Sequence, residues 1–526
     1  PSGVTVTNLA HAEGELGSLS GGDDNPFVAL NDAFFTDGAV IQIGDGQRLA
    51  KPVHLLFVTT ASEDGDTAHI RNWIDAGSNA QGTIIESHLS LGQAALIDPA
   101  FPAVTCTAQA NYLTGQRPGD HGIVGNGWYN HELAEVTFWK QPNQTVQSPK
   151  LWHDLRLANG GFTCATMFWW FNMYADVEWS ATPRPMYPAD GSKHFDIYTW
   201  PHELRPALKA ELGEFPFPAF WGPMAGQQSP AGKPEAVSEW IANAAKWIEQ
   251  QQQPTLNLVY LPHLDYNLQR LGPGHPEIAS DLQRIDRIVG GLIEFFEARG
   301  VQVVLLSEYG ITPVERPVHL NRLFRERSWL TIKEELGLDR LDCGNSRAFA
   351  VADHQVAHVY LNDKSIESDV RSLLEGTDGV AAVWGQAEKQ ANGIDHSRAG
   401  DLVVTAAGNA WFTYYYWLDD AMAPDFARCV DIHRKPGYDP VELFKDPVRG
   451  STARVMLKLL KKKLGFRMLM DVVPLDASLV KGSHGCRPSD QADWPILISK
   501  SAQLAADKTL DSTDVYGVLR SHVVGG

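Results

Sequence analysis

The segment FPAVTCTAQANYLTGQRPGDHGIVGNGWY, residues 101–129, carries the residues best suited to chemistry. Thr105 stands at the start of a helix-like stretch, and a Gly-rich loop ending in Asn126 follows it. A hydroxyl at a helix N-terminus meets unpaired backbone N–H groups and the positive end of the helix dipole, a setting that suits an anionic substrate. A threonine hydroxyl still needs a base or a metal ion to become a nucleophile. On these grounds alone, Thr105 is more commonly an N-cap than a nucleophile.

A second cluster of candidate residues lies in CVDIHRKPGYDP, residues 429–440. Asp431 and His433 are alternate residues of a strand-like run, so we expect both side chains on one face. Asp439 follows a Pro-Gly turn. Carboxylate and imidazole donors suit zinc, manganese or iron. The alternative interpretation is a salt-bridged aspartate beside a surface histidine.

The elements that must position these residues predict an α/β fold. From about residue 94 onward, strands alternate with amphipathic helices. In DLQRIDRIVGGLIEFFEARG one helical face carries Leu282, Ile285, Val289, Leu292 and Phe296. The buried-strand run VQVVLLSEYG follows this helix, and LNLVYLPHLDY precedes it. This alternation predicts a parallel sheet with crossover helices.

Two segments depart from the alternation. Residues 161–235 are rich in Trp, Phe, Pro and Gly, and we expect an irregular insertion that lies over the sheet rather than in it. Within it, Trp169 and Trp170 could stack against a base or an aryl ring, or could simply pack the insertion's own core. Residues 452–469, TARVMLKLLKKKLGFRML, predict a basic amphipathic helix with a solvated Lys face and a buried Leu/Met face. A lid or a contact with an anionic surface is the alternative there.

The first segment also resembles a known family. Thr105 lies nine residues before Thr114, and TGQRPGDHGIVGN follows without a gap. This resembles the nucleophile region of the alkaline phosphatase superfamily, in its type I phosphodiesterase/nucleotide pyrophosphatase branch, and the resemblance runs from about residue 94 to 500. It implies an alkaline-phosphatase-like fold in which Thr105 attacks phosphorus and Asn126 holds a phosphoryl oxygen.

The same resemblance implies two divalent metal ions, with zinc as the first expectation and manganese or iron as alternatives. Two ions can stabilise the charge on both the attacking and the leaving oxygen. The family's Asp-x-x-x-His falls on Asp265 and Gln269, and its Asp-His falls on Glu308 and Tyr309, so each pattern lacks its histidine. Its Gly-x-His-Gly is intact around His484. The resemblance therefore gives Asp265, Glu308 and His484 as expected ligands. Asp431 and His433, from the separate cluster at 429–440, could compensate for the missing histidines and complete the expected set.

Residues 1–93 read differently from the rest of the chain. Apolar runs at 39–44, 53–60 and 82–92 are bounded by Gly and Asp and predict strands, and only 25–32 could begin a helix. NPFVALNDAFFTDGA and KPVHLLFVT resemble the β-helix core of the SufB/SufD iron–sulfur cluster assembly scaffolds. Either this segment is a fusion or mis-joined gene, or VHLLFVTT serves as the first strand of the α/β sheet. In the second case Asp64 or Glu63 would supply the family's first metal ligand.

Composition limits the classes of partner. The 526 residues include 44 Lys+Arg and 63 Asp+Glu, a net charge of −19, which argues against a general nucleic-acid binder. The five cysteines form no CxxC pair, so a zinc ribbon is excluded. No apolar run approaches the ~20 residues that span a bilayer. We expect a cytoplasmic protein with a small phosphorylated substrate and with no nucleic-acid or membrane partner.

The leading hypothesis is a metal-dependent phosphoric ester hydrolase of the phosphodiesterase/nucleotide pyrophosphatase type, acting through Thr105. A phosphonate C–P hydrolase would use the same Thr/Asn arrangement. A non-catalytic relative is a further alternative, because Gln269 and Tyr309 remove two expected histidines. The last alternative is an iron–sulfur cluster assembly scaffold, a function that would reside in the N-terminal segment.

Overall fold

The structure is a computed structural model that describes residues 4–8, 38–49, 52–59, 72–90, 93–227, 233–500 and 509–524. The chain divides into two units, residues 1–94 with 498–506 and residues 95–497 with 507–526. Within the described ranges, no helix is both long and apolar enough to cross a membrane.

The N-terminal unit consists of short strands that pair at a long sequence spacing. They are β1 (Val4–Asn8), β2 (Ala39–Ile43), β3 (Val53–Thr59), β4 (Trp73–Ala76) and β5 (Ile84–Ser90). β2 is parallel to β4, with Val40 opposite Trp73, and β3 is parallel to β5, with Val53 opposite Ile84. The paired residues are thus 33 and 31 positions apart in the sequence. This spacing fits stacked coils of the chain, in which each coil covers the apolar side of the next. The strands predicted at 39–44, 53–60 and 82–92 are confirmed.

The pairing of β3 decides between the two interpretations of VHLLFVTT. Among the described strands, β3 forms a two-stranded sheet with β5 and joins none of the four-stranded sheets of the larger unit. The interpretation of this run as the first strand of the α/β sheet is therefore wrong. The predicted helix start at 25–32 and the residues Glu63 and Asp64 lie outside the described residues.

Among the described strands of the larger unit there are three four-stranded sheets, and two of them contain parallel pairs. The strands of these two sheets are β6 (Gln93–Asp98), β9 (Cys164–Met167), β10 (Trp179–Pro183), β11 (Ile197–Trp200), β12 (Leu256–Val259), β13 (Val304–Leu306), β24 (Ile496–Ser499) and β25 (Leu510–Asp511). One sheet has the order β11-β10-β9-β12, in which β9 is parallel to β10 and to β12. The other has the order β13-β24-β6-β25, in which β25 is parallel to β6.

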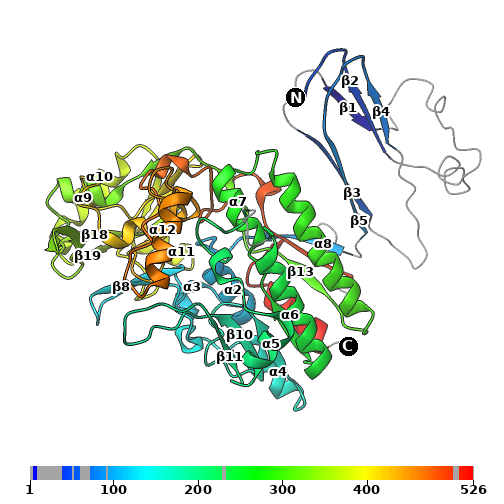
Figure 1. Ribbon diagram of the computed structural model, residues 1–526, viewed down its shortest axis with the longest axis horizontal. Coiled ribbons are helices and arrows are strands. Elements are labelled where there is room, and N and C mark those ends of the chain that lie inside the picture. The colour runs from blue at the N-terminus through cyan, green and yellow to red at the C-terminus, as the bar shows by residue number, and fades with distance from the viewer. Residues whose placement is uncertain are drawn as a thin grey trace, which may run out of the picture. The chain divides into compact units, whose positions relative to one another are not determined.

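Helices α6 (Ala236–Gln252) and α8 (Ile278–Glu297) run side by side and pack on the first sheet (Figure 1). β9 is parallel to β12 and α6 lies between them in the chain, as the crossover pattern predicts. The strands on either side of α8, β12 and β13, belong to different sheets. The predicted apolar face of α8 is buried only toward its C-terminal end. Leu292 is 8% exposed there, whereas Leu282 is 42% exposed. The run VQVVLLSEYG was expected to be buried but is only half-buried, because β13 is an edge strand that pairs only with β24 among the described strands.

The prediction that residues 161–235 lie over the sheet is wrong for their first half. β9, β10 and β11 all come from this segment and form three of the four strands of the first sheet. Aromatic residues pack the layer between these strands and α6, with Phe168 close to Phe215 and Trp240. The aromatic-rich composition thus reflects a core rather than a cover.

A third, antiparallel sheet carries the largest apolar cluster. Its order is β18 (Ala348–Asp353), β19 (Val356–Leu361), β21 (Leu402–Ala406) and β20 (Val380–Trp384). In the turn between β18 and β19, Asp353 pairs with Val356, and His354 has a left-handed φ of 59°. A non-glycine residue in this region is strained, and such strain gathers at functional sites.

The remaining elements connect these sheets or cover them. The helices are α2 (Thr105–Thr114), α3 (Pro118–His121), α4 (Leu151–Ala158), α5 (Leu204–Leu212), α7 (His263–Leu271), α9 (Leu320–Glu326), α10 (Glu367–Glu375), α11 (Gln386–Ala391), α12 (Thr452–Lys463) and α13 (Val515–Val524). The short strands are β7 (Gly127–Asn130), β8 (Glu135–Phe138), β14 (Thr312–Pro313), β15 (Arg316–Val318), β16 (Ile332–Glu335), β17 (Leu338–Leu341), β22 (Ala410–Phe412) and β23 (Gly482–Ser483). The helix predicted at 452–469 forms as α12, but its Leu/Met face is not buried.

Candidate active site

Helix α2 positions the candidate nucleophile. All ten of its residues are buried, and Thr105 is its first residue, with Val104 as the extended N-cap. The helix ends at Gly115, whose φ of 64° is the left-handed conformation that glycine adopts without strain. Thr105 therefore lies at the positive end of a helix held rigidly inside the unit, as the sequence predicts.

A chain of hydroxyl groups leads from Thr105 to Asp265. Thr105 Oγ1 lies 3.0 Å from the Tyr309 hydroxyl, and that hydroxyl donates to Asp265 Oδ1 at 3.2 Å. Asp265 comes from the first turn of α7, directly after β12, and Tyr309 follows β13. The carboxyl ends of β12 and β13 thus deliver their side chains to the N-terminus of α2.

His484 completes this group from the Gly-x-His-Gly pattern. Its ring stacks on Tyr309 with centroids 3.7 Å apart and planes 7° apart, and its Nε2 lies 3.7 Å from Asp265 Oδ1. The structure disfavours a side chain at both glycines of the pattern. A Cβ at Gly482 would lie 2.1 Å from the Leu268 carbonyl oxygen, and Gly485 has a φ of 120°.

Glu308 contacts helix α2 close to Thr105. Gln109, one turn along α2, donates from Nε2 to Glu308 Oε1 at 2.5 Å. The Oε1 of Gln109 accepts from the backbone N–H of Trp170 at 2.6 Å. The Gln109 side chain therefore links α2 to the end of β13 and to the loop after β9 by hydrogen bonds.

Asn126 is fixed beside the same helix end. Its Oδ1 accepts from the backbone N–H of Cys106 at 3.1 Å, and its Nδ2 donates to Asp353 Oδ1 at 3.1 Å. Asp353 Oδ2 also accepts from the backbone N–H of Asn126 at 2.7 Å. An amide nitrogen carries two protons, so the second proton of Asn126 Nδ2 is free to serve a phosphoryl oxygen.

Sequence reasoning missed Asp353 and His354. His354 Nδ1 lies 2.8 Å from Asp353 Oδ1. The His354 ring lies between the rings of Tyr438 and His484, whose centroids are 3.5 Å and 3.8 Å from its own. The Tyr438 hydroxyl in turn donates to Gln269 Oε1 at 3.0 Å. The available signal was the polar pair Asp-His between the apolar runs AFAVA and VAHVYL, an unusual place for two ionisable residues.

Burial dominates the electrostatics of the site. It raises the pKa of Asp265 to about 6, that of Glu308 to about 8 and that of Asp353 to about 6. Burial also holds the pKa of His484 and of His354 well below the usual value for histidine. The imidazoles are therefore neutral, and each offers an unprotonated nitrogen at neutral pH. Clustered shifts of this kind are typical of functional sites.

Part of this group suits a divalent metal ion. His484 Nε2 is buried without a hydrogen-bond partner among the described residues, while its Nδ1 lies 2.7 Å from the Ala103 carbonyl, which orients the ring. Asp265 supplies a nearby carboxylate. Within the described part of the chain, however, no three His, Cys, Asp or Glu side chains come together as a metal site. Tyr309 and Gln269 occupy the places where the family pattern has imidazoles, so neither pattern supplies its histidine to the second expected ion.

Asp431 and His433 do not join the group around Thr105. The strand predicted for them is wrong, because residues 432–434 form a turn. Asp431 Oδ2 pairs with Arg434 Nε at 3.3 Å, and His433 Nδ1 lies 3.3 Å from the Phe138 carbonyl oxygen. These contacts match the salt-bridged aspartate and surface histidine of the alternative interpretation. Their role as metal ligands stays a prediction without geometric support.

Trp169 and Trp170 are each only 6% exposed. Trp170 packs with Cys106, Ile123 and Phe171 behind α2, and Trp139 meets its ring edge to face at 5.2 Å. The pair is close to the site but buried, so a stacking role toward a substrate stays a prediction.

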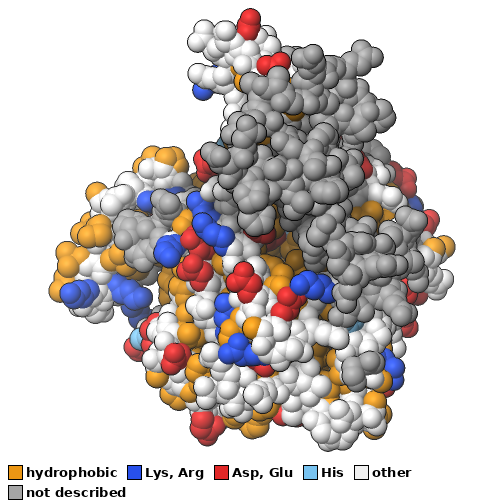
Figure 2. Space-filling model, turned by 90° about the vertical axis from the view of Figure 1, so that its right-hand side faces the viewer, with side chains coloured by type: hydrophobic (Ala, Val, Ile, Leu, Met, Phe, Trp, Pro, Cys, Tyr) orange, Lys and Arg blue, Asp and Glu red, His pale blue; other side chains and the backbone are white. Residues whose placement is uncertain are grey.

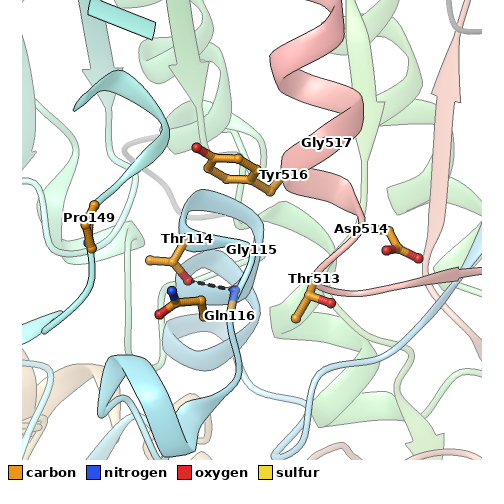
Figure 3. A pocket seen from close by; sticks show the side chains of 8 residues that line it. All are labelled: Thr114, Gly115, Gln116, Pro149, Thr513, Asp514, Tyr516 and Gly517. Atoms are coloured by element: carbon orange, nitrogen blue, oxygen red, sulfur yellow. Dashed lines mark hydrogen bonds between the residues drawn. The ribbon is translucent and has the colours of Figure 1, made fainter. Parts of the chain in front are cut away.

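A shallow pocket of about 460 Å³ lies at the opposite end of α2. Thr114, Gly115 and Gln116 form one side, and Tyr516 of α13 lies over the helix end (Figure 3). The Gln116 backbone N–H donates to Thr114 Oγ1 there at 3.2 Å. Because Thr105 is the first residue of α2 and Thr114 the last, this pocket is separate from the candidate active site.

Parts of the chain are similar to curated proteins. A 240-residue stretch is 25% identical to an uncharacterized pyrophosphatase/phosphodiesterase of Schizosaccharomyces pombe, covering 43% of this chain and 40% of that protein. A 106-residue stretch is 30% identical to the iron–sulfur cluster assembly protein SufD of Escherichia coli, covering 19% of this chain and 25% of SufD. The chain thus spans less than half the length of these curated relatives.

Among solved structures, phosphonoacetate hydrolase from Sinorhizobium meliloti superimposes with a TM-score of 0.50 at 14% identity, over 82% of this chain and 87% of that one. This likeness confirms the α/β, alkaline-phosphatase-like fold expected from the sequence. Residues 87–439 match the family model for type I phosphodiesterase/nucleotide pyrophosphatase, which is more than half of the chain. The chain therefore belongs to the type I phosphodiesterase/nucleotide pyrophosphatase family.

Proposed function

We propose that the chain hydrolyses phosphoric esters, as a phosphodiesterase or nucleotide pyrophosphatase, with Thr105 as the nucleophile. The observation that carries the proposal is the placement of Thr105 at the N-terminus of the buried helix α2, with the Asn126 amide anchored to the next residue of that helix. The positive helix end and a free amide proton together suit the oxygens of a phosphoryl group.

In the proposed reaction, Thr105 Oγ1 forms a bond to phosphorus while the bond from phosphorus to the leaving oxygen breaks. The Thr105 proton passes to the Tyr309 hydroxyl, which gives its own proton to Asp265, and the leaving oxygen departs with the bonding electron pair. The hydroxyl proton lies along the contact with Tyr309, which points the oxygen lone pairs away from that contact. Asn126 and the end of α2 hold the non-bridging oxygens. Water then displaces Thr105 from the phosphoryl group and restores the hydroxyl.

Asp265 and His484 would hold a divalent ion, since they offer a carboxylate oxygen and an unpartnered buried imidazole nitrogen. Such an ion would supply positive charge next to the phosphoryl oxygens. Zinc is the first expectation, because imidazole and carboxylate donors suit it.

Hydrolysis of bis(p-nitrophenyl) phosphate, with and without added zinc or manganese, tests the proposal. The wild type is expected to release p-nitrophenol, Thr105→Ala to release none, and Thr105→Ser to retain part of the rate because it keeps the hydroxyl. Equal rates in the wild type and Thr105→Ala would remove Thr105 as the nucleophile. Turnover of phosphonoacetate but not of the diester, lost in the same variant, would assign the phosphonate C–P hydrolase instead.

A further inference from the structure

Helix α12 is amphipathic, yet its apolar side faces solvent. Met456 is 62% exposed, Leu457 54%, Leu459 46% and Leu460 52%. No residue of the helix is buried. Spacings of three and four residues place Met456, Leu459 and Leu460 on one side of the helix. An amphipathic helix of a globular protein ordinarily turns that side inward.

The opposite side of α12 faces the protein. Lys458 has a side chain only 16% exposed, forms an ion pair with Asp471 and donates from Nζ to the Leu469 carbonyl oxygen at 3.0 Å. Asp471 is also held by Arg449 Nη1 at 3.0 Å. These contacts hold the Lys458 side of the helix against the protein, while the apolar side faces outward.

The exposed apolar surface continues past the end of the helix. Leu464 is 66% exposed, Phe466 65% and Leu469 48%. Seven large apolar side chains are therefore exposed within residues 456–469. Single exposed apolar residues are ordinary, but a contiguous group marks an interaction surface.

Basic residues border this apolar surface. Residues 452–469 contain six Lys or Arg and no Asp or Glu, in a chain whose net charge is −19. On the face drawn in Figure 2, by contrast, basic and acidic side chains lie interspersed. Lys461, Lys462 and Lys463 are all exposed at the C-terminal end of the helix.

We propose that residues 452–469 bind the surface of an anionic membrane. Exposed leucine and phenylalanine next to a cluster of four to eight basic residues is the chemistry of an interfacial helix on anionic lipid. The twelve residues of α12 extend about 18 Å, too short for the ~30 Å hydrocarbon core, so the helix lies along the surface rather than across it.

The shape of the surface favours a membrane over an acidic protein. A partner groove would take a single ridge of side chains at helical spacing. Here the exposed apolar residues lie both on the helix and on the segment that follows the turn at Gly465. Such a spread suits the fluid surface of a membrane. The long Lys stems can cover apolar surface while their ammonium groups reach the headgroups.

Flotation of the full chain with vesicles tests the proposal. Vesicles of phosphatidylcholine with about a third phosphatidylserine are expected to carry the wild type, and pure phosphatidylcholine vesicles to carry far less. Replacing Lys461, Lys462 and Lys463 by Gln is expected to weaken binding on the order of a hundred-fold, about fivefold for each lysine. Leu459→Ser with Leu460→Ser is expected to abolish it.

The matched control is Leu133→Ser with Leu157→Ser, which alters two leucines that are 63% and 89% exposed elsewhere in the same unit. The control is expected to bind as the wild type does. No binding to anionic vesicles, or equal binding by the Leu459/Leu460 variant, would overturn the proposal. A dimer in sedimentation equilibrium that only this variant disperses, without vesicle binding, would overturn it in favour of a second copy.

Discussion

The hydroxyl groups of Thr105 and Tyr309 lie 3.0 Å apart, and the Tyr309 hydroxyl donates its only proton to Asp265. Thr105 is therefore the donor in the contact between them. From sequence, Tyr309 was only a poor replacement for a metal-binding imidazole. In the structure it is the residue that sets the direction of the candidate nucleophile.

Tyr309→Phe removes this contact without changing the stacked ring. Because Thr105 then loses its hydrogen-bond acceptor, we expect kcat to fall by roughly 10- to 100-fold with little change in KM. Steady-state kinetics on a diester measure both. Tyr360→Phe is the matched control, since the Tyr360 hydroxyl also accepts one hydrogen bond and donates one, to Arg398, away from Thr105.

Glu308 is the competing acceptor, because it also lies close to Thr105. If Glu308 takes the Thr105 proton instead, Tyr309→Phe leaves kcat unchanged and Glu308→Gln abolishes turnover. That pair of results would contradict the role given to Tyr309.

Asp353→Asn is expected to disturb Asn126 and to lower both activity and stability. The carboxylate accepts from the Asn126 backbone and side chain and contacts His354, and an amide cannot accept at both of its ends. Losing a buried acceptor costs about 1–3 kcal/mol of unfolding free energy. Denaturant titration measures this loss, and an unchanged unfolding midpoint with wild-type kcat would show that Asp353 does not hold Asn126.

Metal content separates the two groups of expected ligands. His484→Ala is expected to weaken zinc binding more than tenfold, because it removes a buried, oriented imidazole nitrogen. His433→Ala is expected to leave it unchanged, because His433 is exposed in a turn. Elemental analysis after dialysis measures both. Weaker zinc binding in His433→Ala, with unchanged binding in His484→Ala, would instead place the metal site at Asp431 and His433.

His121, in the Gly-rich segment after α2, provides a pH test outside the ligand group. Burial lowers the pKa of His121 to about 3, and its Nδ1 accepts from the Ile123 backbone N–H at 3.1 Å. The unfolded chain binds this proton near pH 6.5. Between these values the unfolded state holds more protons than the native state, so stability falls as pH falls from about 6.5 toward 3.

His121→Gln should therefore show a smaller drop in melting temperature over that range than the wild type does. His202→Gln, at an exposed histidine, serves as the control and should keep the wild-type slope. An equal slope in His121→Gln would mean that another group causes the acid sensitivity.

The sequence predicts the parts of the site that one short segment holds. Thr105, Asn126 and the loop between them follow from the spacing within a single motif, and the glycines around His484 follow from close backbone approaches. Asp353 and His354 come from a different sheet and meet Asn126 only through tertiary folding, so no local pattern reveals them. The strand expected at Asp431 failed for a similar reason, because Glu442 and Arg434 hold that segment in a turn.

Burial was harder to predict than the type of element. Helix α12 forms where its periodicity indicates, yet its Lys458 side pairs with Asp471 and its apolar side faces outward. Periodicity shows which residues share a side of a helix but not which side the rest of the fold will cover. In the same way, β13 has the composition of a central strand and lies at an edge of its sheet.

Trapping the covalent intermediate is a direct test of Thr105 as the nucleophile. The wild type is mixed with bis(p-nitrophenyl) phosphate, quenched in acid within one turnover, digested and analysed by mass spectrometry. We expect a phosphoryl adduct on Thr105 that forms at the rate of the first p-nitrophenol release. Turnover without an adduct, or with the adduct on another residue, would contradict it.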